Sequence, residues 1–268
     1  MKATVAAVQM NCRMGNVRAN LDTIRKIANR LKKYKPDIVC FPELATTGYS
    51  LNEKWRSFAE EIPGKTTDEL SKIASEIGSY LICGVDERDS GSDAIFDSAV
   101  LISPSGKIIG VYRKVHLWDK ERNYFTSGSG FPVFETRFGK IGIGICYDIE
   151  FPEAARALAV NGAQLLVFPS AEMSPMERYV DTYAKSRASE NCCFLAFSNR
   201  VGSENGTHFF GRSQIVSPEC KVQVRAAKGD SFCMTEIDLS ILEKLRSKLP
   251  YLSQLVPQYY YGQLPIRA

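Results

Sequence analysis

The chain has 268 residues, and 44% of them are hydrophobic, which is enough apolar sequence for the core of one large domain. The 34 basic and 30 acidic residues nearly balance, and the net charge of +4 is spread along the chain. We therefore expect neither nucleic acid nor a membrane surface as a partner. The apolar run at residues 5–10 is too short for a secretory leader or a membrane span, and no later segment is long enough either.

The eight cysteines contain no Cys-x-x-Cys pair, and most of them lie in apolar runs that resemble strands. This usage is typical neither of a metal site nor of a disulfide framework. We expect reduced thiols, and hence a cytoplasmic protein.

The first half of the chain alternates strand and helix patterns. Residues 3–10 alternate as a strand, and residues 16–35 form an amphipathic helix that Asn16 caps. The apolar run 37–44 is a second strand, parallel to the first because a helix connects them, and Glu43 falls at its C-terminal tip. The next predicted elements are a helix at 67–79 capped by Thr66 or Thr67, a strand at 81–85, a hairpin of strands 97–102 and 107–114, and a loop at 116–128.

One stretch in the middle of the chain combines a strand pattern with a helix start. After Lys140, residues 141–145 alternate isoleucine with glycine, which is typical of a buried strand approached closely by another backbone or a substrate. Pro152, between Glu150 and Glu153, favours the first turn of a helix. Cys146 therefore lies at a sharp strand-to-helix turn, near unpaired backbone N–H groups. We interpret Cys146 as a candidate nucleophile, although a buried, unreactive thiol is the commoner role of a cysteine.

The second half repeats the order of the first. Its predicted elements are a helix from Pro152 to Asn161, a strand at 164–169, a helix at 176–191, strands at 194–199, 211–217, 221–226 and 232–238, and a short helix at 239–249. Residues 36–43 resemble residues 163–170, and the turn at 102–107 resembles that at 216–221. Chance similarity of short turns is the alternative, but the shared order of elements favours a duplication.

Two such halves, each with helices on one face of a mixed sheet, predict sheet-on-sheet packing in four layers. No linker rich in proline, glycine or serine separates them. We therefore predict one domain at residues 1–249, followed by an extended tail rich in proline and tyrosine at residues 250–268.

A thiol needs a base to take its proton, because at an ordinary pKa of about 8.5 it is only a few per cent ionised near neutrality. The two histidines, His116 and His208, do not lie at an obvious strand tip. Glu43 does, and a strand parallel and adjacent to that of Cys146 would place its carboxylate beside the sulfur. Lys114, near the exit of the predicted hairpin, could stabilise an oxyanion. A solvated surface charge is the alternative for both residues.

Three separated blocks of the sequence resemble the signature blocks of the nitrilase superfamily of carbon–nitrogen hydrolases. They are Phe-Pro-Glu-Leu at 41–44, Tyr-Arg-Lys-Val-His-Leu at 112–117, and Gly-Ile-Cys-Tyr-Asp at 144–148 with Phe-Pro-Glu at 151–153. Stretches at 125–128, 187–191, 198–202 and 211–213 are also similar to family sequences, so the resemblance covers nearly the whole chain. The resemblance implies an α/β fold, a four-layer αββα sandwich of two mixed β-sheets flanked by helices, and a Glu-Lys-Cys triad.

The resemblance also implies a role for each residue of the site. Cys146 is the nucleophile, Glu43 the general base and then acid, and Lys114 the stabiliser of the oxyanion. The backbone N–H of Tyr147 is the second oxyanion donor, which makes Tyr147 a substrate-binding residue. Glu121 matches a further active-site glutamate of many members, and a surface carboxylate is its alternative role.

Members of the superfamily hydrolyse nitriles, amides or N-carbamoyl compounds, and some transfer acyl groups. The loop after Lys114 lacks the long insertion of some carbamoyl-amine hydrolases, so the favoured function is an amidase for a small linear carboxamide, acting through a thioester without a cofactor or metal. An N-carbamoyl hydrolase or a nitrilase on the same triad is the alternative. A catalytically silent binding or regulatory protein, or a Cys-His hydrolase that uses His116 or His208, are alternatives of other classes.

The resemblance further implies a homodimer or a higher homo-oligomer, assembled through the helices at about 153–161 and 176–191. The tail at 250–268 is apolar enough to lie across a neighbouring subunit. Packing on its own chain is the alternative.

Overall fold

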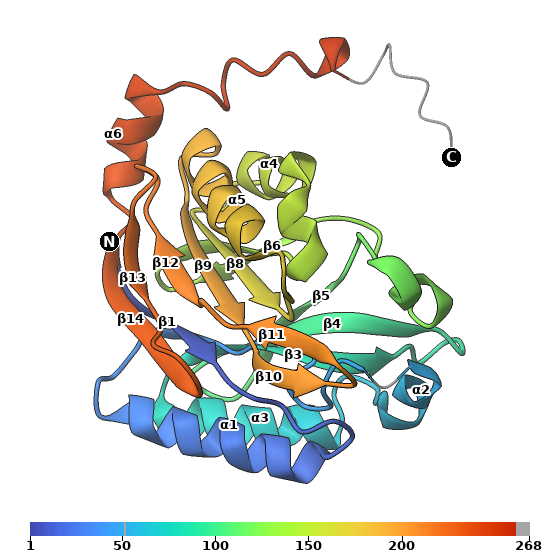
Figure 1. Cartoon of the computed structure of the whole chain (residues 1–268). Helices are drawn as coiled ribbons and strands as arrows, with labels where there is room; N and C mark the ends of the chain where they lie inside the picture. The colour runs from blue at the N-terminus through green and yellow to red at the C-terminus, as the bar shows by residue number, and fades with distance from the viewer. Residues whose placement is uncertain (51, 261–268) are drawn as a thin grey trace.

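The computed structural model, which describes residues 1–50 and 52–260, is built on two six-stranded β-sheets packed face to face (Figure 1). In spatial order the first sheet consists of β14 (Ser231–Asp238), β1 (Lys2–Gln9), β2 (Ile38–Cys40), β3 (Tyr80–Arg88), β4 (Ile95–Ile102) and β5 (Ile108–Arg113). The second consists of β13 (Val222–Arg225), β12 (Gln214–Val216), β9 (Phe194–Asn199), β8 (Leu165–Ser170), β7 (Gly139–Ile143) and β6 (Val133–Thr136).

The two sheets share one pattern of strand directions. In the first, β1, β2 and β3 run parallel, and β4, β5 and β14 are antiparallel to the strands they pair with. In the second, β7, β8 and β9 run parallel, and β12, β13 and β6 are antiparallel. The C-terminal strand β14 thus holds in the first sheet the place that β6 holds in the second. The predicted repeat of 36–43 in 163–170 corresponds to β2 and β8, which take equivalent places.

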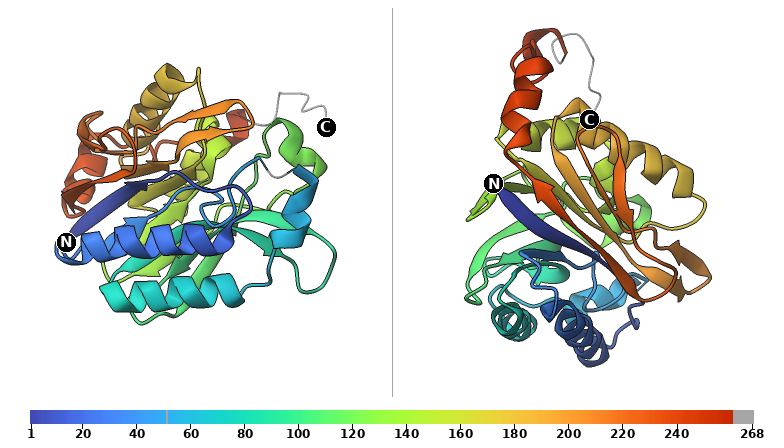
Figure 2. Two further views of the ribbon diagram at one scale, coloured as in Figure 1. Left: turned by 60° about the horizontal axis from the view of Figure 1, so that its bottom comes forward. Right: turned by 90° about the vertical axis from the view of Figure 1, so that its left-hand side faces the viewer.

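Helices cover both outer faces, and the predicted four-layer αββα sandwich is confirmed (Figure 2). Helices α1 (Val17–Lys32) and α3 (Lys65–Ile77) pack on the first sheet, and α4 (Pro152–Val160) and α5 (Glu177–Glu190) pack on the second. Asn16 caps α1 as predicted, because its side-chain oxygen accepts the N–H of Ala19 at 3.1 Å. Helix α3 begins two residues before the predicted start, since Gly64 rather than a threonine is its N-cap.

Both faces of the central strands are buried, as the mixed sandwich requires. In β1, Val5 and Ala7 pack between the two sheets, while Ala6 and Val8 pack under the helices of the first outer layer. The alternate side chains of β1 therefore face two different apolar layers, not one apolar layer and solvent. Gly142 of β7 allows close helix packing, because a Cβ there would lie only 2.9 Å from a Leu158 side-chain atom of α4.

Several short elements escaped prediction. The loop predicted at 116–128 contains the 3₁₀ helix η2 (Asp119–Asn123), and the short helix α2 (Trp55–Phe58) and strand β6 were not expected. A hairpin of β10 (Val201–Glu204) and β11 (Thr207–Phe210) was also missed. Its turn is Asn205-Gly206 with φ of 46° and 84°, the dipeptide and geometry of a tight hairpin, so the sequence did carry a signal for it.

The last elements run away from the sandwich edge toward the second outer layer. Helix α6 (Ile241–Lys248) follows β14, and the chain from Pro250 to Tyr260 continues over the side that carries α4 and α5 (Figure 1). It contains a turn at 251–254 and the 3₁₀ helix Pro257–Tyr259 rather than one extended strand. The rest of the predicted tail, residues 261–268, lies outside the described residues. Within the described ranges, no helix is both long and apolar enough to cross a membrane.

Candidate active site

Cys146 lies where β7 ends and a helix begins, as predicted. It is the first residue of the 3₁₀ helix η3 (Cys146–Glu150), and Pro152 then opens α4. The φ of Cys146 is +43°, a conformation that residues with a Cβ adopt rarely and that marks a sharp turn. The bond from Asp148 N–H to the Ile145 carbonyl opens η3 at 2.9 Å. Cys146 and Tyr147 precede it, so their N–H groups belong to the unpaired first turn of the helix.

A buried carboxylate holds this turn in place. Asp148 Oδ2 accepts hydrogen bonds from Ile145 N–H at 2.8 Å and from the Tyr112 hydroxyl at 2.6 Å. Its Oδ1 accepts from the backbone N–H of His116 at 3.0 Å and lies 2.7 Å from His116 Nδ1. The His116 ring is also stacked on Phe151, with ring centroids 3.8 Å apart. Asp148 therefore ties the cysteine turn to the segment that follows β5, and His116 has a positioning role in this network.

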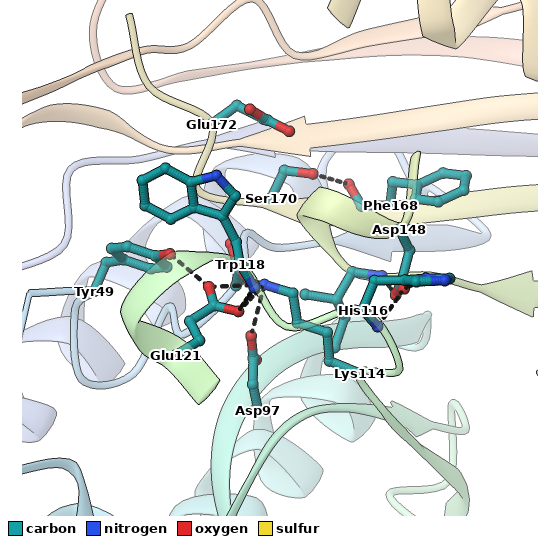
Figure 3. Close-up of polar contacts among 12 residues, drawn as sticks. Tyr49, Asp97, Lys114, His116, Trp118, Glu121, Asp148, Phe168, Ser170 and Glu172 are labelled. Carbon is teal, nitrogen blue, oxygen red and sulfur yellow. Dashed lines mark hydrogen bonds and ion pairs between the residues drawn. The ribbon is translucent and has the colours of Figure 1, made fainter. Parts of the chain in front are cut away.

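Lys114 lies among three carboxyl groups in the interior of the molecule (Figure 3). Its Nζ is 2.6 Å from Glu43 Oε1, 2.9 Å from Glu121 and 3.4 Å from Asp97 Oδ2. All four side chains are buried, and the hydroxyl of Tyr49 donates to Glu121 Oε1. The structure therefore brings Glu43, Lys114 and Glu121 together, and adds Asp97, which the sequence did not single out.

Burial and charge work against each other in this cluster. Burial alone lowers the pKa of Lys114, but Glu121, Glu43 and Asp97 raise it, and the net change is upward, so the ammonium stays charged. Burial raises the pKa of both Asp97 and Glu121, and their repulsion by Glu43 adds to this. The carboxyl oxygens lie within 4.8 Å of one another, close enough to hold a cation, and the Lys114 ammonium supplies positive charge at that point.

The residues of the predicted triad follow strands of both sheets, not neighbouring strands of one sheet. Glu43 follows β2 and Lys114 follows β5 in the first sheet, whereas Cys146 follows β7 in the second. The expectation that Glu43 and Cys146 come from adjacent parallel strands is wrong, because β2 pairs with β1 and β3, and β7 with β6 and β8. Because the two sheets pack face to face, Glu43 and Lys114 are nevertheless close enough to Cys146 to affect its pKa.

The thiol and the charged cluster influence one another. Burial raises the pKa of Cys146, Glu172 and Glu43 raise it further, and Lys114 lowers it. The Cys146 thiol is therefore neutral near neutral pH, and it would need a base to become a nucleophile. Neither histidine is placed to act as that base. His116 Nδ1 contacts Asp148, and His208 Nδ1 on β11 lies 3.3 Å from the Ser203 hydroxyl.

Cys146 opens onto a cavity of about 360 Å³. Its lining residues are Tyr49, Trp118, Cys146, Tyr147, Glu150, Glu172, Met173, Ser174, Pro175 and Met176. The size suits a small molecule. Of the predicted site residues, Cys146 and Tyr147 face this space, while Glu43 and Lys114 have no exposed surface.

The loop that carries Tyr49 is fixed from the β10–β11 hairpin. Glu204 Oε2 accepts the N–H groups of Tyr49 and Ser50 at 3.0 and 2.9 Å, and Arg200 donates to Glu204 Oε1 at 2.6 Å. Both Arg200 and Glu204 are buried. The missed hairpin thus has a function, since it holds one wall of the cavity.

Glu172 is the most informative residue that the sequence reasoning missed. It lies two residues beyond β8, the strand equivalent to β2, whose end carries Glu43. Burial raises its pKa to about 8, and Glu150 and Glu43 contribute. The internal repeat pointed to this strand end, but Ser170 stands at the position that matches Glu43, so no acidic residue was expected there.

Comparison with known proteins gives one family. A sequence profile described as carbon–nitrogen hydrolase matches residues 4–247. A protein of Schizosaccharomyces pombe described as a probable nitrilase is 40% identical over 226 residues, which is 83% of this chain and 83% of that protein.

Solved structures agree in fold. The carbon–nitrogen hydrolase from Helicobacter pylori G27 superimposes with a TM-score of 0.90 at 30% identity, covering 99% of both chains. A mutant of the amidase from Nesterenkonia sp. AN1, with the acetamide moiety of fluoroacetamide added covalently at its active-site cysteine, gives a TM-score of 0.87 at 26% identity, covering 98% of this chain and 97% of that one.

Proposed function

This chain belongs to the carbon–nitrogen hydrolase family, and we propose that it is an amidase that cleaves a small carboxamide to a carboxylate and ammonia through a thioester on Cys146. The observation that carries the proposal is the Cys146 thiol at the wall of a cavity of about 360 Å³, near enough to the buried Lys114–Glu43 pair that both charges act on its pKa after burial and Glu172. The Nesterenkonia amidase, with an acetamide group on its cysteine, supports the same use of Cys146.

In the first stage Cys146 Sγ attacks the amide carbon while Glu43 takes the thiol proton. The carbonyl oxygen becomes an oxyanion, which the Lys114 ammonium and the Tyr147 N–H stabilise. The C–N bond then breaks as Glu43 gives its proton to the nitrogen, and ammonia leaves. Glu43 is charged before the first proton transfer and after the second, and Lys114 Nζ at 2.6 Å stabilises that charged form.

In the second stage a water molecule attacks the thioester carbon, and Glu43 takes its proton. The C–S bond breaks, the carboxylic acid leaves, and Cys146 recovers its proton from Glu43. Glu121 acts by position: its contact with Lys114 at 2.9 Å and its hydrogen bond from Tyr49 hold the ammonium toward the reacting carbon.

A nitrilase is the second candidate, because the Schizosaccharomyces pombe relative carries that description. The same thiol would add to a nitrile carbon, and the same products would follow after two waters are consumed. An N-carbamoyl substrate would instead release an amine and carbon dioxide with ammonia. A silent binding protein is less well supported, since Glu43, Lys114 and Cys146 retain a full proton-transfer and oxyanion apparatus.

Ammonia release by the purified protein tests the proposal against panels of small amides, nitriles and N-carbamoyl compounds. We expect turnover of amides, its loss in Cys146→Ala and its near loss in Cys146→Ser, with the fold kept. Cys220→Ser is the matched control, because Cys220 is an exposed thiol away from the cavity. If Cys146→Ala released ammonia as fast as the wild type, the thioester mechanism would be wrong.

We also propose a homo-oligomer that assembles through α4 and α5, with residues 250–268 as an extension of the catalytic domain. The outer faces of these helices carry exposed apolar side chains, Val160 at 57% and Tyr179 at 55% exposure, and Tyr251 and Tyr259 of the tail are exposed as well. The free cysteines of the described chain support a reducing compartment, the cytoplasm.

A further inference from the structure

We propose that this amidase selects substrates that carry a positive charge, and that Glu172, with Glu150 in the same cavity wall, binds an ammonium group of the substrate. The inference rests on the proposed function and names its substrate class: small carboxamides that bear an amine.

Glu172 is fixed by its backbone, and its carboxyl group lies at the cavity wall beside the Cys146 thiol. Its N–H donates to Asn199 Oδ1 at 2.8 Å, and its carbonyl accepts from Asn199 Nδ2 at 3.2 Å. The residue is only 5% exposed, and its side chain lines the cavity. Among residues 1–50 and 52–260, the carboxyl group of Glu172 contacts the Cys146 thiol and forms no ion pair with a lysine or an arginine. Burying a carboxylate without a counter-charge costs free energy, and a cationic ligand would offset that cost.

The charged residues that line the cavity favour a cationic ligand. Two carboxyl groups, Glu172 and Glu150, lie in its wall, and none of its described lining residues is lysine, arginine or histidine. Lys114 is fully buried and already surrounded by three carboxyl groups. A substrate with a carboxylate would therefore meet repulsion without compensation, whereas an ammonium group would relieve the mutual repulsion of Glu172 and Glu150. The raised pKa of Glu172, about 8, has burial and this repulsion among its causes.

The other walls favour a short alkyl ammonium. Figure 3 shows Trp118 between Tyr49 and Glu172, and Tyr147 lines the same space. Aromatic faces attract cations, and Met173 and Met176 add a flexible apolar surface for methylene groups. A cavity of about 360 Å³ has room for a short amide that carries an amine, with its amide carbon at Cys146.

Three amides of similar length test the inference: 4-aminobutanamide as the cation, pentanamide as the neutral molecule and the monoamide of glutaric acid as the anion. At pH 8.5 the alkyl amine, with a pKa of about 10.4, is charged. We expect the wild type to prefer the cation over both others by at least about tenfold in kcat/KM. Glu172→Gln should lower the cation-to-neutral ratio by about tenfold to a hundredfold, the range for losing a hydrogen bond to a charged group.

Glu153→Gln is the matched control, because Glu153 is exposed on α4 and the same charge is removed outside the cavity. It should leave the cation-to-neutral ratio unchanged. Calorimetric binding of 4-aminobutanamide to Cys146→Ala gives a second measurement that needs no turnover, and Glu172→Gln on that background should weaken binding by a similar factor.

Different failures have different meanings. A wild type that prefers pentanamide or the glutaric monoamide overturns the inference and leaves the amidase standing. An equal fall in kcat for all three amides in Glu172→Gln also overturns it, because the residue would then serve proton transfer with Cys146. If no amide is hydrolysed, the proposed function fails, and the binding measurement still decides whether the cavity selects cations.

Discussion

Replacing Lys114 with methionine removes one positive charge from among Glu43, Asp97 and Glu121 while keeping a side chain of similar length. The wild-type ammonium lies 2.6 Å from Glu43, the shortest of its three contacts. With an effective dielectric constant of about 20, that pair alone contributes ~6 kcal/mol of attraction, which is partly offset by the desolvation of the ammonium. Removing one partner of a buried pair costs about 3–5 kcal/mol, and we expect a loss of unfolding free energy in that range at pH 8.

The loss should depend on pH in a defined direction. Burial already raises the pKa values of Asp97 and Glu121, and without the ammonium they should rise further. Such carboxyl groups bind protons more tightly in the folded than in the unfolded protein, so their contribution to stability is present at low pH and is lost as the pH rises through the folded pKa. The variant should therefore be closer to the wild type at pH 5.5 than at pH 8.

Urea denaturation followed by the fluorescence of the two tryptophans, at both pH values, measures these differences. Lys72→Met is the control: Lys72 is exposed on α3 and paired with Glu69, so this change should have no measurable effect. A loss in Lys114→Met below about 1 kcal/mol at pH 8, or an equal loss at both pH values, would refute the view of Lys114 as the counter-charge of this cluster.

Further predictions concern the turn, the cavity and the tail. Asp148→Asn should destabilise the protein by about 2–4 kcal/mol and lower kcat for every amide, since charged hydrogen bonds to the cysteine turn are lost; thermal unfolding and kinetics check this. The affinity for 4-aminobutanamide should rise between pH 7 and 9, because the empty Glu172 carboxyl loses its proton at about 8, and a flat profile would contradict the cation site. The charged or titratable groups that influence Glu172 are Glu150, Glu43, Lys114 and Cys146. Removal of residues 250–268 should reduce the number of subunits in the assembly, measured as molar mass by light scattering. An unchanged number of subunits would exclude the tail from the assembly.

Much of the fold was predictable because its elements have strong local patterns. The Ile-Gly alternation before Cys146 and the Asn16 cap depend on neighbours in sequence, and both correspond to observed elements. The repeat of 36–43 in 163–170 corresponds to β2 and β8. The two halves predicted sheet-on-sheet packing, the resemblance to the nitrilase superfamily implied the same four-layer sandwich, and the topology and the solved structures confirm it.

What the sequence could not supply was pairing over long distances. β14 closes the first sheet against β1, so that Lys2 lies opposite Asp238, and β2 and β7 lie in different sheets although both precede a site residue. Periodicity describes which face of a strand is apolar, and not which strand lies beside it. The burial of Asp97 and Glu172 depends on that packing, so neither carboxyl group could be distinguished from a solvated one.

The central claim is that substrate becomes attached to one particular sulfur. Mixing the wild-type protein with an excess of a small amide, stopping the reaction with acid within one turnover and mapping the peptides by mass spectrometry tests it directly. We predict the mass of the acyl group on the peptide that contains Cys146 and on none of the seven other cysteines. Steady ammonia release with no acyl group on Cys146, or with the group on another cysteine, would contradict the account.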